Sequence, residues 1–167
     1  TEFIVFDDGI KAKEAKGKDS KKSLRTELGL ITYEPNLLFN RGPRVMTIIV
    51  PNARSKTQFH KYMAEEKGAL KCAYNSDPKD KKLFVLCNKK PKWNQNIRAY
   101  CLNFHGRVTL PSVKNFQVSN ADNEEHVVLQ FGKVGEHEFT LDLTYPLSPL
   151  QAFAVALSSF DNKKVVD

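Results

Sequence analysis

The segment that most constrains the fold is SPLQAFAVALSSF, residues 148–160. Ser148 suits an N-cap, Pro149 the first helical position, and Gln151 follows the cap by three, which together form a capping-box signature. The pattern therefore predicts a helix. Its side chains are apolar on every face until Ser158, and it is too short to cross a bilayer. A helix of this kind is expected to be encased by other protein elements.

Strands wrapped around the helix would provide such an environment, and most of the remaining chain alternates with period two. In EFTLDLTY, for example, Phe139, Leu141 and Leu143 share one face. We therefore expect Phe153 and Leu157 to be nearly inaccessible inside an antiparallel barrel or sandwich. The candidate strands are residues 2–6, 28–34, 44–50, 82–88, 98–104, 112–119, 126–134 and 138–145.

Two connecting segments are expected between these strands. GKVGE, residues 132–136, contains Gly132 and Gly135 and predicts a hairpin turn. Residues 52–82 are polar and irregular, and are interpreted as an insertion with a short helix at 57–67. No internal repeat is visible, and 167 residues suit one domain.

The positive charge is concentrated in one segment. The chain carries a net charge of +7, and residues 11–22 contain six lysines against Glu14 and Asp19. A concentrated patch fits a compact anion, an acidic partner or an anionic membrane surface. The three cysteines show no C-x-x-C spacing and favour a reduced, intracellular setting. Neither a signal peptide nor a membrane-spanning run is predicted.

The sequence does not favour catalysis. The four histidines show neither H-E-x-x-H nor H-x-H spacing, and no Cys/His cluster predicts zinc. No P-loop, G-x-S-x-G or G-x-G-x-x-G occurs. We therefore expect no catalytic residue, no metal and no cofactor. Nucleic-acid binding is the alternative from another class, but the charge is clustered and no aromatic residues are interleaved with the basic ones.

Two long motifs resemble the C-terminal domain of the Tubby-like protein family. FHGRVTLPSVKNFQ, residues 104–117, matches the family signature except that Pro111 replaces an alanine, and QAFAVALSSFDNK, residues 151–163, is close to the family's C-terminal motif. The final KVVD departs from the usual Leu-Ala-Cys-Glu ending. Further similar stretches are RGPRVM (41–46), KPKWN (90–94), VVLQFGKV (127–134) and FTLDLTYPL (139–147).

The resemblance implies a fold. It is a mainly β domain, a closed antiparallel β-barrel that encloses a central hydrophobic C-terminal α-helix. By this comparison residues 1–167 form a tubby C-terminal domain that lacks roughly its first third. A Lys-x-Arg pair of the family falls before Thr1, so the family's headgroup site is represented here only in part. Phospholipid scramblases are thought to share this barrel, so the fold alone would not decide the function.

The resemblance also implies a function: reversible binding of phosphatidylinositol 4,5-bisphosphate. The chain is then expected to be a cytoplasmic, monomeric adaptor for membrane-protein trafficking or signalling, peripheral at the inner plasma membrane, with the nucleus or cilium as further locations and a protein cargo as a further partner. The alternative is a nucleic-acid-binding transcription regulator. The sequence identifies neither the cargo nor the preferred phosphoinositide isomer.

Arg25 is the predicted headgroup residue, because the family segment Leu-Arg-x-Glu-Leu appears here as LRTEL. A guanidinium can hold two phosphate oxygens with parallel hydrogen bonds. The structural alternative is an ion pair between Arg25 and Glu27 or another surface carboxylate. The preceding basic loop is expected to attract an anionic membrane without gripping a headgroup; its lysines are Lys11, Lys13, Lys16, Lys18, Lys21 and Lys22. Arg107 and Lys114 are interpreted as structural residues, and Trp93 as a loop aromatic that caps the barrel, with insertion into a membrane as the alternative.

Overall fold

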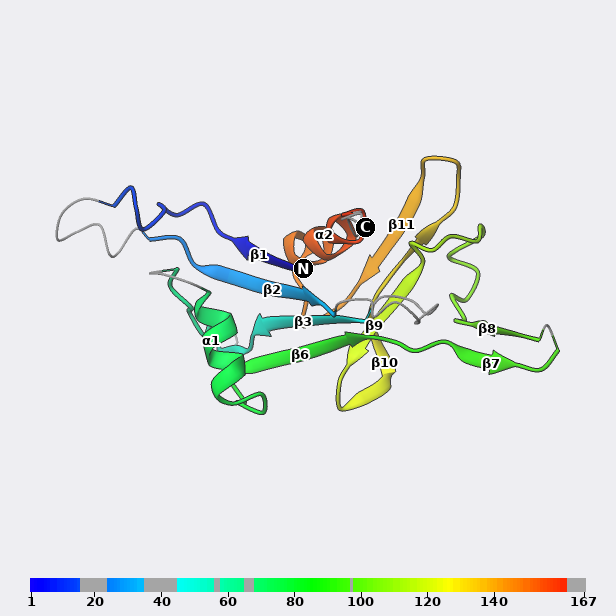
Figure 1. The fold of residues 1–167 in the computed structure, drawn as a ribbon, viewed down its shortest axis with the longest axis horizontal. Helices are drawn as coiled ribbons and strands as arrows, with labels where there is room; N and C mark the ends of the chain where they lie inside the picture. Colours follow the sequence, from blue (N-terminus) through cyan, green and yellow to red (C-terminus); the bar gives the residue numbers. More distant parts are fainter. Residues whose placement is uncertain (16–23, 35–44, 56–57, 65–67, 97, 162–167) are drawn as a thin grey trace, which may run out of the picture. The chain divides into compact units, whose positions relative to one another are not determined.

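The computed structural model describes residues 1–15, 24–34, 45–55, 58–64, 68–96 and 98–161 (Figure 1). Seven strands form one sheet in the order β1-β2-β3-β6-β9-β10-β11. The elements are β1 (Glu2–Phe6), β2 (Glu27–Tyr33), β3 (Met46–Pro51), β4 (Ala53–Ser55), β5 (Gln58–Phe59), α1 (Ala69–Ser76), β6 (Leu83–Asn88), β7 (Lys92–Asn94), β8 (Ala99–Cys101), β9 (Phe116–Asn120), β10 (Asn123–Lys133), β11 (Phe139–Leu143) and α2 (Pro149–Ser158).

The mainly β character of the chain is confirmed, whereas the closed barrel is not. The strand pairs with a defined register are antiparallel. Within the described residues, β1 and β11 lie at the two ends of the strand order, and the sheet does not close on itself. The chain divides into two compact units, residues 1–35 with 46–85 and residues 36–45 with 86–167, and each is described by itself.

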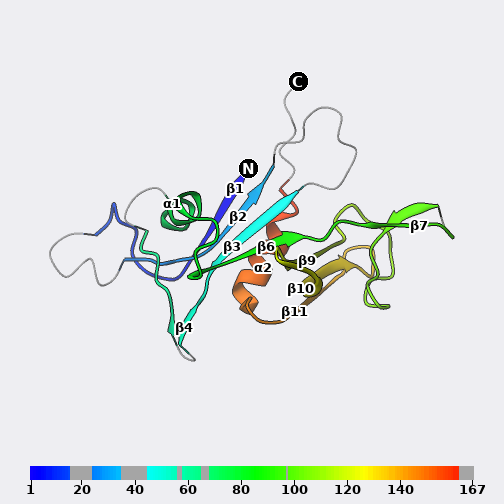
Figure 2. The same cartoon turned by 90° about the horizontal axis from the view of Figure 1, so that it is seen from below.

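The first unit consists of β1, β2 and β3 side by side, with α1 packed against β2 and β3 (Figure 2). Its core contains Leu30 and Ile49 from the strands, Leu70 from the helix and Leu83 at the start of β6. The helix predicted at 57–67 is wrong: residues 58–59 pair with β4 as a short strand, and the helix begins only at Ala69.

The second unit is built on the antiparallel strands β9, β10 and β11. The predicted turn between β10 and β11 is confirmed, since Val134 N and Gly135 N donate to the carbonyl of Glu138. Gly132 is required within this hairpin, because a Cβ there would lie 2.3 Å from a methyl carbon of Val108. The signature motif therefore packs directly onto β10.

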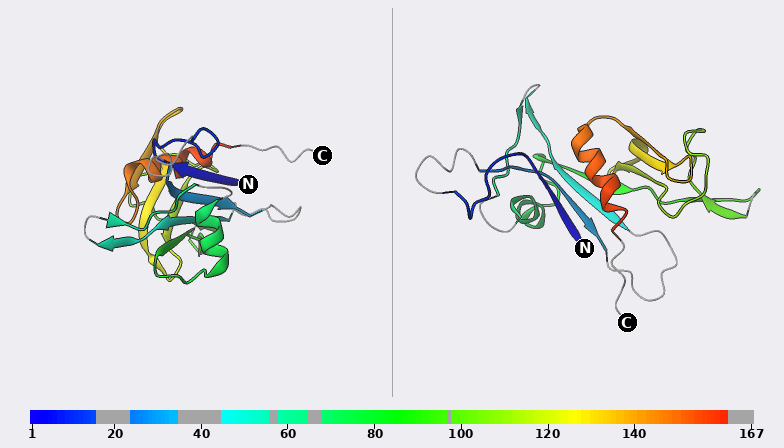
Figure 3. Two further views of the ribbon diagram at one scale, coloured as in Figure 1. Left: turned by 90° about the vertical axis from the view of Figure 1, so that its left-hand side faces the viewer. Right: turned by 90° about the horizontal axis from the view of Figure 1, so that it is seen from above.

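Helix α2 begins as the sequence predicts and packs against β11 (Figure 3). Ser148 Oγ accepts a hydrogen bond from Gln151 N, and Gln151 Oε1 accepts one from Ser148 N, which completes the capping box. At the other end of the helix, Phe160 packs edge-on against Phe139 and Phe131.

The expectation that α2 is encased on every side is wrong for the described structure. Ala152, Val155 and Ala156 are buried, but Phe153 and Leu157 are 56% and 54% exposed. Together with Leu150 these two side chains follow helical spacing and form one exposed apolar stripe. The composition of the helix therefore does not predict that, among the described residues, one of its faces is buried and the other is exposed.

Candidate functional site

Arg25 lies in the first unit, immediately before β2, and its main chain is anchored on both sides. Arg25 N donates to the carbonyl of Ile10, at 3.0 Å, and the carbonyl of Arg25 accepts from Ala64 N, at 3.1 Å. Leu24 forms an isolated bridge with Ile10, and Thr26 forms one with Met63. The root of the Arg25 side chain is consequently fixed by two segments that are remote in the sequence.

The guanidinium of Arg25 lies over the ring of Phe6, with Cζ 3.6 Å from the ring centroid. Such cation–π stacking orients the planar group. Arg25 Nε is buried and has no hydrogen-bond partner in the part of the chain that the structure describes. No carboxylate of the described residues is in ion-pair distance of Arg25. The site therefore presents an oriented cation whose charge these residues leave uncompensated.

The loop after β1 passes close to Arg25 because residue 9 is a glycine. A Cβ at Gly9 would lie 2.4 Å from Arg25 Cα and 2.5 Å from Arg25 N, both of them backbone atoms. Asp7 ties the same loop to the site, since its Oδ1 accepts from Thr26 N at 2.7 Å and from Gly9 N at 3.1 Å. Burial raises the pKa of Asp7, but these hydrogen bonds outweigh it and hold the pKa below its ordinary value.

Asp7→Asn should lower the free energy of unfolding by about 1 kcal/mol at pH 7, because a neutral amide is a weaker acceptor at a partly exposed position. A carboxylate whose folded-state pKa is depressed stabilises the fold above its unfolded pKa of about 3.9, and this contribution is lost as the pH falls through the folded-state value. The difference between wild type and variant should therefore shrink below pH 4 in urea titrations. An undiminished difference at pH 2.5 would contradict the assigned role of the charge.

Glu27, the proposed alternative partner of Arg25, has a different role. Its side chain is 1% exposed, and its two carboxylate oxygens accept hydrogen bonds from Ala69 N and Leu70 N at 2.9 and 2.8 Å. The Arg25–Glu27 ion pair is therefore wrong. Gly68, the N-cap of α1, has no side chain to satisfy these amides, and a carboxylate near a helix N-terminus is favourable.

The sequence contains one signal for the buried role of Glu27. Glu27, Gly29, Ile31 and Tyr33 occupy the same face of β2 by period two, and all four are buried. A charged residue at such an inward position requires buried hydrogen-bond donors. The donors lie 42 and 43 positions away, so the sequence could indicate the requirement and not the partner.

The basic loop is described only in part. Lys11 and Lys13 are exposed, and Lys11 Nζ lies 3.7 Å from a carboxylate oxygen of Glu14. Because both groups of this pair are more than half exposed, the ion pair holds the loop only weakly. The other predicted lysines lie outside the described residues: Lys16, Lys18, Lys21 and Lys22.

Arg107 and Lys114, in the second unit, have structural partners. Arg107 holds Asp142 with two hydrogen bonds, Nε to Oδ2 at 3.0 Å and Nη2 to Oδ1 at 2.7 Å. The hydrogen bond from Arg107, followed by one from Gln130, lowers the pKa of Asp142. Lys114 Nζ donates to the carbonyl of Ser159 at the end of α2, a favourable place for a cation. The two cations thus connect the signature motif to β11 and α2.

The described residues contain neither a metal-binding cluster nor a membrane-spanning helix. No group of three or more His, Cys, Asp or Glu residues among them is arranged to hold a metal ion. None of the helices described is both long enough and apolar enough to cross a membrane.

The described chain is thus a mainly β protein with a capped C-terminal helix and an oriented arginine beside β2. It belongs to the Tub family, whose model matches residues 1–162. It is 44% identical to Tubby-related protein 2 of Mus musculus over 163 residues, which are 98% of this chain and 29% of that protein. The identity is 46% over 161 residues with Tubby-related protein 1 of Mus musculus, covering 96% and 30%.

A more distant animal relative gives the same result. Tubby protein homolog 1 of Caenorhabditis briggsae is 41% identical over 170 residues, with 98% of this chain and 39% of that protein covered. The chain thus spans less than half the length of these curated relatives. The activities and partners of the longer proteins are therefore assigned to this chain only as proposals.

Proposed function

We propose that the chain is a phosphoinositide-binding module that associates reversibly with the inner plasma membrane through phosphatidylinositol 4,5-bisphosphate. The observation that carries the proposal is the guanidinium of Arg25, stacked on Phe6 and left without a carboxylate partner by the described residues. A phosphate monoester carries the oxygen pair and the negative charge that such a group binds best. Membership in the Tub family supports the proposal.

The proposal includes a role and a location. A module that binds one lipid headgroup reversibly suits a monomeric, cytoplasmic adaptor that carries a protein cargo to the membrane. It needs neither catalysis nor a cofactor. The closed barrel is part of the proposal too: further strands that paired with the outer edges of β1 and β11 would close the sheet.

The direct test is cosedimentation with phosphatidylcholine vesicles that contain phosphatidylinositol 4,5-bisphosphate. Vesicles in which phosphatidylserine supplies the same surface charge are the control, and a DNA fragment at the same salt concentration tests the alternative of a nucleic-acid-binding regulator. A preference for the phosphoinositide at equal charge is expected. Equal binding to both kinds of vesicle would refute headgroup recognition, and stronger binding to DNA would favour the alternative.

Neutralising the basic loop with Lys11→Gln, Lys13→Gln, Lys16→Gln and Lys18→Gln together should weaken binding to anionic vesicles by about tenfold and flatten its salt dependence. Preference among phosphoinositide isomers should remain, because attraction over a distance carries little geometric information. Vesicle titrations at two salt concentrations measure both effects. Loss of isomer preference in this variant would show that the loop contacts the headgroup directly.

A further inference from the structure

The hairpin of β7 and β8, in the second unit, carries two exposed aromatic rings side by side. Trp93 and Tyr100 are directly opposite each other in the antiparallel register. Their ring centroids are 5.2 Å apart with an interplanar angle of 67°, and the residues are 53% and 70% exposed. Trp93 therefore lies in a strand and not in the predicted loop, and its exposed ring agrees with the alternative of membrane insertion. An exposed pair of large rings indicates a contact surface.

Basic residues surround this pair. The segment from Leu86 to Asn103 contains Lys89, Lys90, Lys92 and Arg98 and no acidic residue. Lys90 and Arg98 are exposed, and no carboxylate in the described ranges forms an ion pair with either. The structure thus corrects the expectation that aromatic and basic residues are not interleaved.

Glu125 of β10 compensates part of this charge. It forms ion pairs with Lys89 Nζ at 3.4 Å and with Lys92 Nζ at 2.8 Å. The hydrogen bond from Lys92, and then the charge of Lys89, lower the pKa of Glu125, so its carboxylate stays ionised at neutral pH. Glu124 also acts on the charge of Lys92. Two acids against four basic side chains leave the hairpin an excess of positive charge.

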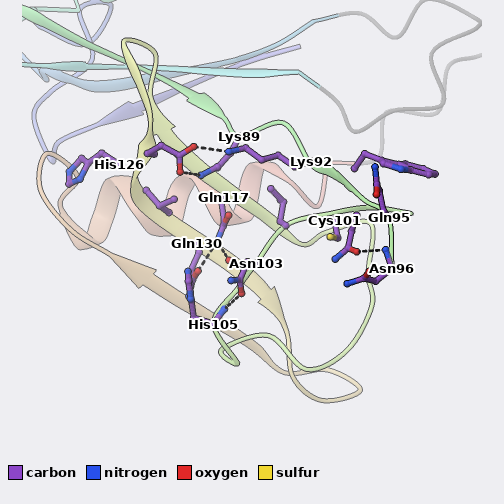
Figure 4. Close-up of a pocket in the computed structure, with 15 residues that line it drawn as sticks. Lys89, Lys92, Gln95, Asn96, Cys101, Asn103, His105, Gln117, His126 and Gln130 are labelled. Carbon is purple, nitrogen blue, oxygen red and sulfur yellow. Dashed lines mark hydrogen bonds and ion pairs between the residues drawn. The ribbon is translucent and has the colours of Figure 1, made fainter. Parts of the chain in front are cut away.

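A hollow of about 820 Å³ lies beside the hairpin, and Trp93 and Lys92 form part of its wall (Figure 4). Two of its amide side chains bond to each other. Gln117 Nε2 donates to Gln130 Oε1 and to the carbonyl of Asn103, and Gln130 Nε2 donates to Asp142, which lies outside the hollow's lining. The exposed rings and cations are its distinctive chemistry.

We propose that the β7–β8 hairpin is a second membrane-binding element, with an anionic lipid surface as its partner. Trp93 and Tyr100 then lie in the interfacial layer, where amphipathic aromatic rings are most favourable. Lys90 and Arg98 extend their apolar stems beside the rings and place their charges among anionic headgroups. An anionic lipid leaflet is proposed as the partner because its negative charge complements the excess positive charge of the hairpin.

The ring geometry disfavours single-stranded nucleic acid as the partner. Successive bases stack on aromatic faces that are accessible and roughly parallel. Trp93 and Tyr100 meet edge to face, so each ring covers part of the other. The same arrangement forms a compact apolar wedge, which suits insertion among lipid headgroups.

The inference extends the proposed function with an element that does not involve Arg25, and Trp93 allows the two to be tested separately. It is the single tryptophan of the chain, so tryptophan emission reports on the hairpin alone. Phosphatidylcholine vesicles with phosphatidylserine and without phosphoinositide should shift the emission to the blue. Brominated lipids should quench it. Arg54→Ala, which removes an exposed arginine of β4, should leave both responses unchanged.

Variants provide the second readout, cosedimentation with the same vesicles. Trp93→Ala with Tyr100→Ala should reduce partitioning by at least about tenfold. Lys90→Gln with Arg98→Gln should abolish the preference for phosphatidylserine over phosphatidylcholine vesicles. The matched controls are Phe59→Ala, which removes an aromatic ring that is 55% exposed in β5, and Lys79→Gln with Lys81→Gln. The conservative Tyr100→Phe should retain binding, and circular dichroism identifies any variant that fails to fold.

The outcomes separate this inference from the proposed function. Sedimentation with phosphoinositide vesicles without any change in tryptophan emission overturns the hairpin contact and leaves the Arg25 site standing. A blue shift on phosphatidylserine vesicles, together with equal binding to phosphoinositide and phosphatidylserine vesicles, supports the hairpin contact and overturns the Arg25 site. Quenching by a single-stranded oligonucleotide, with no effect of brominated lipids, would overturn the inference in favour of nucleic acid.

Discussion

Glu27→Ala is expected to lower the free energy of unfolding by about 3 kcal/mol, the largest stability effect that the structure predicts for a single side chain near the site. The variant leaves the amides of Ala69 and Leu70 without their carboxylate acceptors, and Leu70 belongs to the buried core. An unsatisfied buried donor costs about 1–3 kcal/mol, and hydrogen bonds to a charged acceptor are the stronger kind. Urea unfolding followed by circular dichroism measures the loss.

The matched control is Glu2→Ala. Glu2 also connects a strand to α1, through Lys71 at 2.6 Å, but both of these side chains are 45% exposed. This pair should contribute less than about 1 kcal/mol, because exposed ion pairs gain little over hydration. Glu27→Gln should fall between the two, since one amide oxygen can still accept. Similar losses for Glu2→Ala and Glu27→Ala would show that burial of the carboxylate is not what matters.

Arg25→Ala is expected to weaken binding to phosphatidylinositol 4,5-bisphosphate by about ten- to a hundredfold. Charge-assisted hydrogen bonds contribute about 1.5–3 kcal/mol, which corresponds to that range of affinity. Stability should change little, because the described residues provide no ion pair that the substitution would break. The measurement is a vesicle titration at constant surface charge, in parallel with a thermal unfolding curve.

Four further variants define the role of the guanidinium. Arg54→Ala removes an exposed arginine from β4 and should leave affinity unchanged. Arg25→Lys should recover only part of it, because an ammonium group cannot make the two parallel hydrogen bonds. Phe6→Leu, which keeps an apolar side chain but removes the stacking surface, should weaken binding, and Phe6→Tyr should restore it. Equal affinity of Arg25→Ala and wild type would place the headgroup site elsewhere.

Local patterns in the sequence were sufficient for most elements of the fold. The capping box placed the start of α2 correctly at Ser148, and β1 coincides with the predicted strand at residues 2–6. These features are encoded by residues within a few positions of one another. The segment 98–104 shows the limit of the approach, since only Ala99–Cys101 forms a strand.

Other features depend on partners that are distant in sequence and could not be predicted. The composition of α2 indicated burial on all sides, but Phe153 remains exposed because burial depends on which strands face each side of the helix. At the site, LRTEL identified Arg25 through a family resemblance. The ring under its guanidinium and the close approach of Gly9 are contacts between segments 16 or more positions apart.

The two hydrogen bonds between the Glu27 carboxylate and the first amides of α1 have a consequence for local dynamics. A helix of eight residues is too short to be stable alone in water. We therefore expect α1 to unfold locally when the hydrogen bonds from its first amides to Glu27 break. Glu27 N also donates to the carbonyl of Tyr62, close to the bond between Ala64 and the Arg25 carbonyl, so this local unfolding would loosen the main chain at Arg25. The helix and the arginine therefore belong to one cooperative opening unit. A ligand that holds Arg25 in place should therefore slow hydrogen exchange at the amides of Ala69 and Leu70, even though the ligand does not contact these amides.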